Sequence, residues 1–179
     1  MVLKPQDLVV ALQLALLDFP EQWTYPELAE RLKLSVSETN AATHRASDAR
    51  LLTRARGRDA KPTPIHASLL TFLEGGVPFA FYAQPGELVR GVLTAHCAPP
   101  LADLVMTPPQ SLLVWPSAEG KARGQSISPL YKTVPEAAAG GASLYAALAL
   151  VDALRIGRHR ERKIALAELS KLLGCDHGA

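Results

Sequence analysis

The chain of 179 residues predicts an α+β fold, in which helices precede a small mixed or antiparallel sheet and further helices follow it. Three observations support this prediction. Apolar residues recur at three- and four-residue steps up to residue 52, short apolar runs separated by Pro and Gly follow from residue 77, and helical spacing returns after residue 134. The apolar fraction of 48% is ample for a packed core.

The charge distribution is more informative than the net charge, which is only +2. Residues 45–61 contain six basic and two acidic side chains, a local net charge of +4 that resembles an electrostatic footprint for nucleic acid. The amino end lacks the pattern of a signal peptide, and the most apolar window, 144–154, is shorter than the roughly 20 residues that span a bilayer. Two cysteines cannot build a disulfide framework. We therefore expect free thiols, a cytoplasmic location and no membrane partner.

The first helix is predicted over residues 5–18. Pro5 suits a first helical turn because an N–H at that position has no partner within the helix. Leu8, Leu12 and Leu16 lie on one face of this helix. Phe19-Pro20 ends it, since the residue before proline is displaced from the α region.

Two further helices are predicted to begin at capping boxes, Thr24 with Glu27 and Ser35 with Glu38. Because they start in quick succession, they must cross at a steep angle. The second, predicted over 36–51, has a thin inner stripe of Ala and Thr and a polar outer side, on which we place Arg45. An ordinary helical hairpin is the alternative to a helix-turn-helix here.

Residues 53–61 alternate short side chains with arginines around a glycine, which predicts a small basic β-ribbon. Because strand side chains have a period of two, Arg54, Arg56 and Arg58 would project from one face. Two crossed helices followed by such a ribbon form a winged helix-turn-helix, a fold that places one helix in the major groove of DNA.

The sequence from Glu27 to Leu32, the turn and helix start at 34–38, and the closing Asp48-Ala49-Arg50-Leu51-Leu52 together resemble bacterial winged-helix transcriptional regulators of the MarR-like kind. The resemblance covers residues 1–64 and implies a DNA-binding domain there. The chain departs from the family pattern at Arg50, where a glycine is usual at the end of the recognition helix.

The DNA-binding residues predicted from these patterns differ in role. Arginine can make two hydrogen bonds to guanine and asparagine two to adenine, so Arg45 and Asn40 are candidate readers of bases, together with His44. Serines at a helix start suit phosphates, and the ribbon arginines suit the backbone or the minor groove. The complete predicted set is Ser35, Ser37, Asn40, His44, Arg45, Arg54, Arg56, Arg58 and Lys61.

Residues 65–179 are predicted to form a second, α+β domain for dimerisation, sensing or partner contact. A bridging helix at 65–73 precedes strands at 77–83, 88–96, 111–115 and 125–130, and helices follow at 134–138, 144–151 and 161–173. The helix at 144–151 is apolar nearly all round, which indicates either a subunit interface or burial within one subunit.

A second basic cluster lies between Arg155 and Lys163. It is interpreted as a corner between two helices, with its cations favoured at the carboxyl end of the preceding helix. An extension of the DNA surface and a contact with an acidic partner are the alternatives.

Sequence motifs for metal binding or catalysis are weak or missing. His96, Cys97, Cys175 and His177 are ligand types, but neighbours on a strand point to opposite faces and no Cys-x₂-Cys pair is present. Phosphate-binding, nucleophile-elbow and zinc-protease motifs are missing. We therefore predict no enzyme activity, no metal and no cofactor.

These observations lead to the expectation of a homodimeric, sequence-specific regulator that binds double-stranded DNA, with helix 36–51 in the major groove and a basic wing at 53–61. A small-molecule effector or a partner protein would act through the second domain. The main alternative is an antitoxin-like or scaffold protein whose second domain binds a partner protein, with DNA binding for autoregulation. A winged helix that binds only protein is a third interpretation, which the ribbon arginines weaken.

Overall fold

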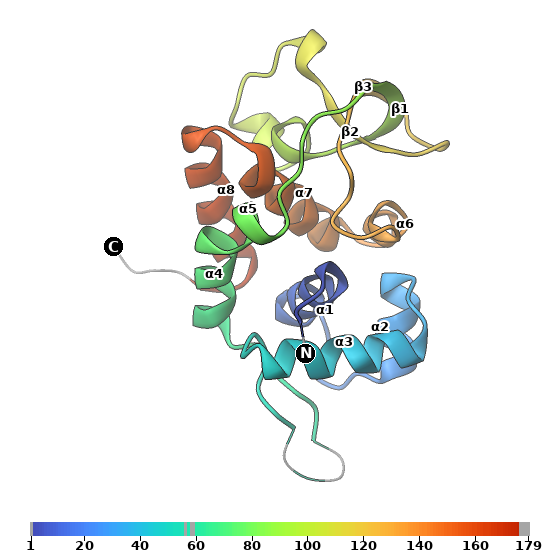
Figure 1. Ribbon diagram of the computed structural model, residues 1–179, viewed down its shortest axis with the longest axis vertical. Helices are drawn as coiled ribbons and strands as arrows, with labels where there is room; N and C mark the ends of the chain where they lie inside the picture. Colours follow the sequence, from blue (N-terminus) through green and yellow to red (C-terminus); the bar gives the residue numbers. More distant parts are fainter. Residues whose placement is uncertain (1, 56, 58–59, 176–179) are drawn as a thin grey trace.

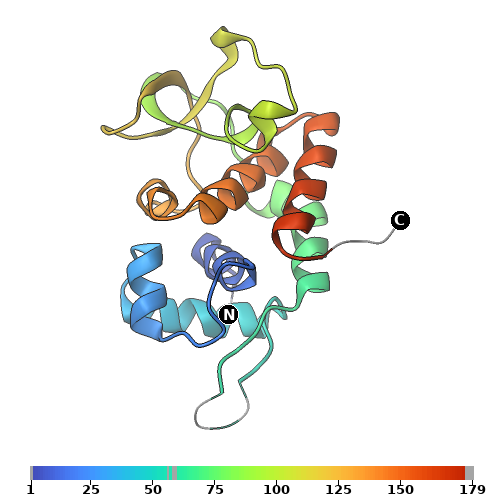
Figure 2. The same cartoon turned by 180° about the vertical axis from the view of Figure 1, so that it is seen from behind.

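The computed structural model describes residues 2–55, 57 and 60–175, and it has the predicted α+β class. Helices α1 to α3 lie at one end of the long axis and the small sheet lies at the other (Figure 1). Helices α7 (Ala142–Ile156) and α8 (His159–Leu172) lie between them, and the view from behind shows the same order (Figure 2).

The amino-terminal helices are α1 (Pro5–Ala15), α2 (Tyr25–Leu32) and α3 (Val36–Asp48). All three begin where the sequence predicts, because prolines and capping side chains are local signals. Two of these helices end earlier in the chain than predicted, at Ala15 instead of residue 18 and at Asp48 instead of residue 51. The chain becomes extended at Leu16, and the left-handed conformation of Arg50 terminates α3 before residue 51.

The helix predicted at 65–73 to connect the two parts of the chain is present as α4 (His66–Gly75). The strand predicted at 77–83 is wrong, since α5 (Val77–Ala80) occupies its first half. Backbone bonds from Ala80 to Gly76 and from Phe81 to Val77 close this turn. A short apolar run satisfies a strand and a buried helical turn equally well, and Pro78 near the helix start favours the turn.

The sheet contains β1 (Leu88–Leu93), β2 (Leu113–Pro116) and β3 (Ala122–Ser126). β1 pairs antiparallel with both other strands, with β3 through its first half and with β2 through its second half. β2 and β3 also pair in parallel over two residues each. Gly91 lies at the change of partner, where an added Cβ would lie 2.0 Å from the Trp115 carbonyl oxygen. Three of the four predicted strands, those at 88–96, 111–115 and 125–130, are therefore present with shifted bounds.

The carboxyl-terminal helices are α6 (Val134–Ala139), α7 and α8, close to their predicted ranges. α7 packs against α1, α4, α5, α6 and α8 of the same chain. This placement corresponds to burial within one subunit, one of the two interpretations left open by its apolar sequence.

The core is continuous across residues 64 and 65. Leu8 and Leu12 of α1 belong to the same cluster of buried side chains as Leu148 and Leu150 of α7. The Thr133 hydroxyl, just before α6, donates a 2.9 Å hydrogen bond to the Leu32 carbonyl oxygen at the end of α2. The helix-turn-helix is therefore built onto the rest of the molecule.

A buried polar network joins the sheet to α7. Asp152 accepts hydrogen bonds from the Thr94 hydroxyl (2.8 Å), the Trp115 indole N–H (2.5 Å) and the Arg155 guanidinium (2.6 Å). Arg155 also donates to the carbonyl oxygens of Phe81 and Ser128. Burial raises the pKa of Asp152, and its charged and hydrogen-bonding partners oppose that shift. No described helix is long and apolar enough to cross a membrane.

Candidate nucleic-acid interface

The first capping box forms as predicted at the start of α2. The Thr24 hydroxyl accepts from the Glu27 backbone N–H at 3.3 Å, and the Glu27 carboxylate accepts from the Thr24 backbone N–H at 2.7 Å. The Thr24 hydroxyl also donates to the Glu27 carboxylate at 2.8 Å, and this bond together with the one from the Thr24 backbone N–H lowers the pKa of Glu27. The box fixes the start of α2, and Leu28 and Leu32 are then buried on its inner face.

Both helices of the pair end at a residue in the left-handed conformation, Lys33 (φ 55°) and Arg50 (φ 61°). After α2 the Leu34 N–H bonds to the Ala29 carbonyl, and after α3 the Leu51 N–H bonds to the Ala46 carbonyl. These are the long hydrogen bonds of a Schellman motif, in which glycine is favoured at the left-handed position. Arg50 thus adopts the conformation of the glycine that is usual in the resembled family.

Replacing Arg50 with glycine is expected to raise the free energy of unfolding by about 1 kcal/mol, because an L side chain disfavours the left-handed region by about that much. The variant Arg54→Gly is a matched control, because it removes an exposed arginine nearby at a position without positive φ. Urea unfolding measures both variants. A destabilised Arg50→Gly variant would show that the side chain supports the wing more than its conformation costs.

The second capping box forms only in part. The Ser35 hydroxyl accepts from the Glu38 backbone N–H at 3.1 Å, so Ser35 caps α3. The Glu38 carboxylate does not return the bond. It accepts instead from Arg45 at 2.5 Å and from the Gln6 side chain at 3.1 Å. These two hydrogen bonds lower the pKa of Glu38.

The placement of Arg45 on the outer face of α3 is wrong. Its residue surface is only 7% exposed, and its guanidinium donates to both carboxylate oxygens of Asp7, which is fully buried. The bonds to Asp7 and Glu38 raise the pKa of Arg45 despite the opposing effect of burial. Arg45 therefore holds α3 against α1 and does not present its guanidinium to a base.

Sequence reasoning gave Gln6 and Asp7 of this cluster no role and assigned Glu38 only to a capping box. A signal was present in the sequence, because Gln6 and Asp7 precede the unbroken apolar run from Leu8 to Leu12. A carboxylate on a helix that is buried on most sides requires a partner. Because Arg45 lies 38 residues from Asp7, the sequence alone does not show which arginine is the partner of this carboxylate.

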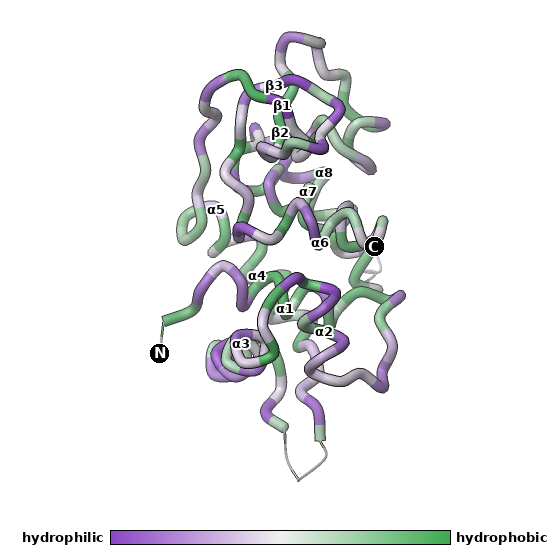
Figure 3. Tube along the Cα trace, turned by 90° about the vertical axis from the view of Figure 1, so that its right-hand side faces the viewer, coloured by the Kyte–Doolittle hydropathy of each residue, from purple (hydrophilic) through white to green (hydrophobic). Residues whose placement is uncertain are grey.

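The outer face of α3 carries Ser37, Asn40 and His44, at helical steps of three and four residues. Ser37 and His44 are exposed and Asn40 is half-buried. None of these three side chains makes a hydrogen bond or ion pair with another residue in the described part of the chain. Figure 3 shows hydrophilic colours over much of α3. These side chains are thus available for an external polar ligand.

The wing is anchored at its base. The Thr53 N–H bonds to the Thr63 carbonyl at 2.7 Å, the Thr63 N–H bonds to the Thr53 hydroxyl, and Leu52 forms an isolated bridge with Pro64. Beyond the bridge, residues 53–55, 57 and 60–63 form no strand, so the predicted β-ribbon does not appear in the described residues. Figures 1 and 2 show this segment extending away from α3.

The wing cations have different environments. Arg54 is exposed and pairs with Asp48 of α3 at 3.1 Å. The Lys61 ammonium lies 4.5 Å from the ring centre of Tyr25 and 5.2 Å from that of Trp23, a geometry for cation–π attraction. Arg56 and Arg58 lie outside the described residues, so their predicted projection from one face is not described.

A pocket of about 290 Å³ lies between α3 and the wing base, lined by His44, Ser47, Asp48 and Arg54 among others. It brings two of the predicted residues, His44 and Arg54, to one surface. Ser37 and Asn40 continue that surface toward the start of α3, where Ser35 lies. Arg45 lies behind this surface, and Lys61 is held on the aromatic rings beside it.

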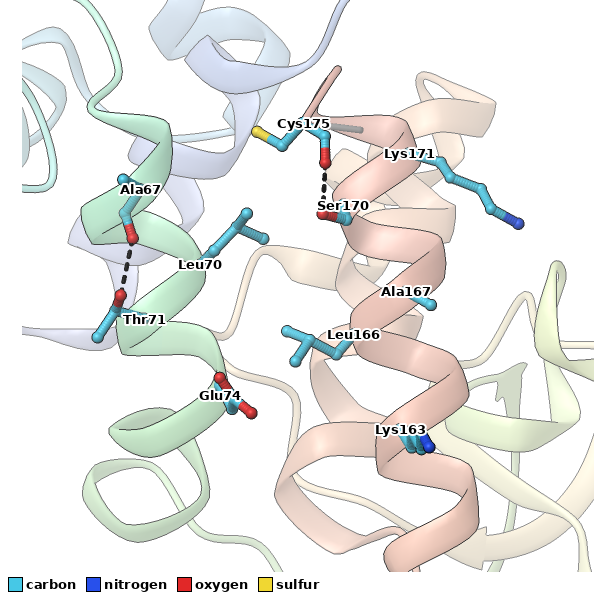
Figure 4. A pocket seen from close by; sticks show the side chains of 10 residues that line it. All are labelled: Ala67, Leu70, Thr71, Glu74, Lys163, Leu166, Ala167, Ser170, Lys171 and Cys175. Carbon is cyan, nitrogen blue, oxygen red and sulfur yellow. Dashed lines mark hydrogen bonds between the residues drawn. The ribbon is translucent and has the colours of Figure 1, made fainter. Parts of the chain in front are cut away.

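A larger groove of about 580 Å³ lies between α4 and α8. Figure 4 shows Leu70 and Leu166 directed toward each other across it, with Glu74 and Lys163 near one end and Cys175 at the other. The groove combines apolar side chains from both walls with the acidic Glu74 on α4 and the basic Lys163 and Lys171 on α8. None of its lining residues precedes Ala67, so it shares no residue with the pocket between α3 and the wing base.

The described cysteines and histidines of the second half form no metal-binding cluster. Cys97 lies in a short 3-10 helix, Ala95–Cys97, and its sulfur accepts from the Leu113 N–H at 3.3 Å. Burial raises the pKa of the Cys97 thiol. The described residues contain no group of three or more His, Cys, Asp or Glu side chains that could hold a metal ion. His177 lies outside the described residues.

No protein-family model matches the chain, and no curated protein or solved structure matches it either. The arrangement of α2, α3 and the wing base therefore carries the functional conclusion.

Proposed function

We propose that this chain is a sequence-specific DNA-binding transcriptional regulator that places α3 in the major groove and the wing segment against the adjacent backbone. The observation that carries the proposal is the outer face of α3, where Ser37, Asn40 and His44 lie in line and make no hydrogen bond or ion pair with the residues that the structure describes. A thin polar face on the second helix of a helix-turn-helix suits the edges of base pairs.

Each part of this face matches a part of a DNA site. The Asn40 amide suits adenine N6 and N7, and the His44 imidazole can donate to a guanine acceptor. Ser35 and Ser37 lie at the amino end of α3, where backbone N–H groups and the helix dipole favour a phosphate. The exposed pair of Arg54 with Asp48 is worth little in water, so a phosphate can displace Asp48 from it.

The buried cluster of Asp7, Glu38 and Arg45 serves recognition indirectly. Arg45 of α3 connects to Asp7 of α1 through charged hydrogen bonds of 2.7 to 3.0 Å, and Glu38 of α3 also accepts from Arg45. Charge-assisted, bidentate bonds of this kind fix geometry as well as adding stability. The cluster therefore sets the angle at which α3 meets DNA.

The double variant Asn40→Ala/His44→Ala is expected to lose sequence-specific DNA binding. Selection from a random 30-base-pair library with the wild-type protein would supply the cognate duplex, and fluorescence anisotropy would measure affinity for it and for a scrambled duplex. We expect a loss of about 30-fold or more on the cognate duplex, since each good base contact contributes about 1–3 kcal/mol.

The double variant Gln84→Ala/Gln110→Ala, which removes exposed polar side chains far along the chain from α3, is the matched control and should bind as wild type. Thermal unfolding checks that both variants remain folded. Equal affinity of the Asn40/His44 variant and the wild type for the cognate duplex would refute reading by α3, and failure of the library to yield any preferred sequence would refute specificity itself.

The proposal includes a homodimer, formed through the α4–α8 groove. A two-fold interface is self-complementary, so one surface must carry both members of each contact. The groove meets this condition with Leu70 and Leu166 as apolar contacts and with Glu74 and Lys163 as opposite charges on its two walls. A second copy could then pair each acid with a base.

Charge reversal tests this interface. Glu74→Lys and Lys163→Glu are each expected to weaken dimerisation about tenfold or more, because like charges then face each other, and the double variant should restore it. Analytical ultracentrifugation measures the dissociation constant. A wild-type chain that stays monomeric, or a double variant no better than the single ones, would exclude this dimer.

A further inference from the structure

The first two turns of α8 carry four exposed cations, Arg158, Arg160, Arg162 and Lys163, which we call the α8 basic cluster. Glu161 is the only acidic residue among them in sequence. His159 adds a fifth exposed side chain that becomes cationic when protonated. The cluster plays no part in the surface formed by α3 and the wing.

The sequence suggested that these cations are favoured at the carboxyl end of the preceding helix, and the structure does not support this for most of them. α7 ends at Ile156, and Arg155 alone lies in its last turn, where a cation is favoured. The other four follow Gly157 and lie at the amino end of α8. That end already carries partial positive charge, so the dipole of α8 disfavours these cations. Their position costs stability.

Nothing in the described part of the chain neutralises the cluster. The Glu161 carboxylate accepts from the backbone N–H of Arg158 at 2.9 Å and lies 3.9 Å from His96 Nδ1. The ion pairs formed by described arginines involve Arg45, Arg54 and Arg155, and the one formed by a described lysine involves Lys171. The four cations thus have no described acid paired to them, and the three arginines lie outside the α4–α8 groove, whose lining includes Lys163.

The cluster lies apart from the proposed DNA surface along the long axis of the molecule. In Figures 1 and 2, α8 begins near the level of the sheet, whereas α3 and the wing occupy the other end of the long axis. A phosphate bound by the cluster would therefore lie outside the groove that α3 would read.

The chemistry of the cluster selects phosphates. Three of its four members are arginines, whose guanidinium groups match phosphate oxygens with two donors each. Residues 158–163 include no aromatic or large aliphatic side chain, so they lack the apolar centre of a protein–protein interface. They span about 7.5 Å along the helix axis, enough for a few neighbouring phosphates.

We propose that the α8 basic cluster binds the phosphate backbone of nucleic acid, at a site separate from the α3 surface. The binding depends on charge and on salt concentration and not on base sequence, because the contacts are made to phosphates. It does not rest on reading by α3.

The test compares the full-length variant Arg158→Gln/Arg160→Gln/Arg162→Gln with the wild type, and uses Lys121→Gln/Arg123→Gln/Lys132→Gln as a control with the same change of charge at exposed positions elsewhere. The probes are a 30-base-pair duplex of scrambled sequence and a 30-nucleotide single-stranded RNA. Fluorescence anisotropy between 50 and 200 mM KCl gives affinity and its salt dependence. Differences between the two probes identify which nucleic acid is preferred.

For the cluster variant we expect affinity at 50 mM KCl to fall about tenfold or more, and the slope of log affinity against log salt to become shallower by about 2–3. Its unfolding midpoint should rise by about 2–4 °C, since a repulsion with the helix dipole is removed. A gain in stability together with a loss of binding is a result that a purely structural role would not give. The control should keep its affinity within about threefold.

Wild-type affinity and salt slope for both probes in the cluster variant would overturn the proposal, and so would an equal loss in the control, which would show that only net charge matters. The proposal for α3 fails in a different way. If the Asn40→Ala/His44→Ala variant keeps its preference for the selected duplex, reading by α3 is excluded while the α8 result stands.

Discussion

Replacing Arg45 with alanine is expected to lower the free energy of unfolding by about 3–5 kcal/mol, because the substitution leaves the carboxylate of Asp7 buried and without its charged partner. Asp7 is 0% exposed and takes three hydrogen bonds from the Arg45 side chain. One further bond, from the backbone N–H of Lys4 at 2.8 Å, cannot replace that charge. Urea unfolding followed by circular dichroism measures the loss.

Two further variants separate the ion pair from simple loss of an arginine. Arg54→Ala removes an exposed arginine whose partner Asp48 is also exposed, and its effect should stay within about 0.5 kcal/mol. Asp7→Leu/Arg45→Met should recover much of the stability, since an apolar pair of similar volume avoids the cost of burying charge. A loss below about 1 kcal/mol in Arg45→Ala would mean that water reaches Asp7.

DNA binding by Arg45→Ala therefore has to be interpreted with its stability in view. A weaker complex would follow from a displaced α3 even though Arg45 touches no base. By contrast, Asn40→Ala/His44→Ala removes side chains that make no hydrogen bond or ion pair with the described part of the chain. The two variants thus distinguish a residue that positions the recognition helix from residues that would contact DNA.

The second large effect is expected for Asp152→Ala, with a loss of about 3–5 kcal/mol. The carboxylate is 1% exposed and accepts from Thr94, Trp115 and Arg155. Its removal leaves the Arg155 guanidinium buried with only carbonyl partners, and it leaves the indole N–H of Trp115 without an acceptor. Denaturant unfolding with tryptophan fluorescence reports both the stability and the environment of Trp115.

Asp152→Asn is the matched variant, because it keeps an acceptor oxygen and the volume of the side chain while removing the charge. We expect it to lose less than Asp152→Ala, with a part of the cost remaining from the unpaired Arg155. Glu87→Ala, an exposed acid in the segment before β1, controls for loss of a negative charge. Equal losses in Asp152→Ala and Glu87→Ala would show that the network contributes little.

Local signals explain what the sequence predicted well. The Thr24–Glu27 box and the prolines at positions 5 and 26 act within one helical turn, and the helices that they start are where they were expected. In each case the determining contacts lie within a few residues.

Distant partners explain what the sequence did not predict. Glu38 completes a capping box by its spacing, yet an arginine seven residues away and Gln6 of another helix compete for its carboxylate. The side on which Arg45 lies depends on Asp7, whose position follows only from how α1 packs on α3. The strand predicted at 77–83 failed for a different reason, because short apolar runs carry no period long enough to separate strand from helix.

The continuous core has a consequence for how such a protein can change over evolution. α1 packs on α3 and also on α7, and the Thr133 hydroxyl bonds to the end of α2. Recombination that moved residues 1–64 onto an unrelated carrier would remove the contacts of α1 with α7 and the hydrogen bond from Thr133 to Leu32. Residues 1–64 and the rest of the chain are therefore expected to be inherited together, and the exposed face of α3 can change by substitution without disturbing the shared core.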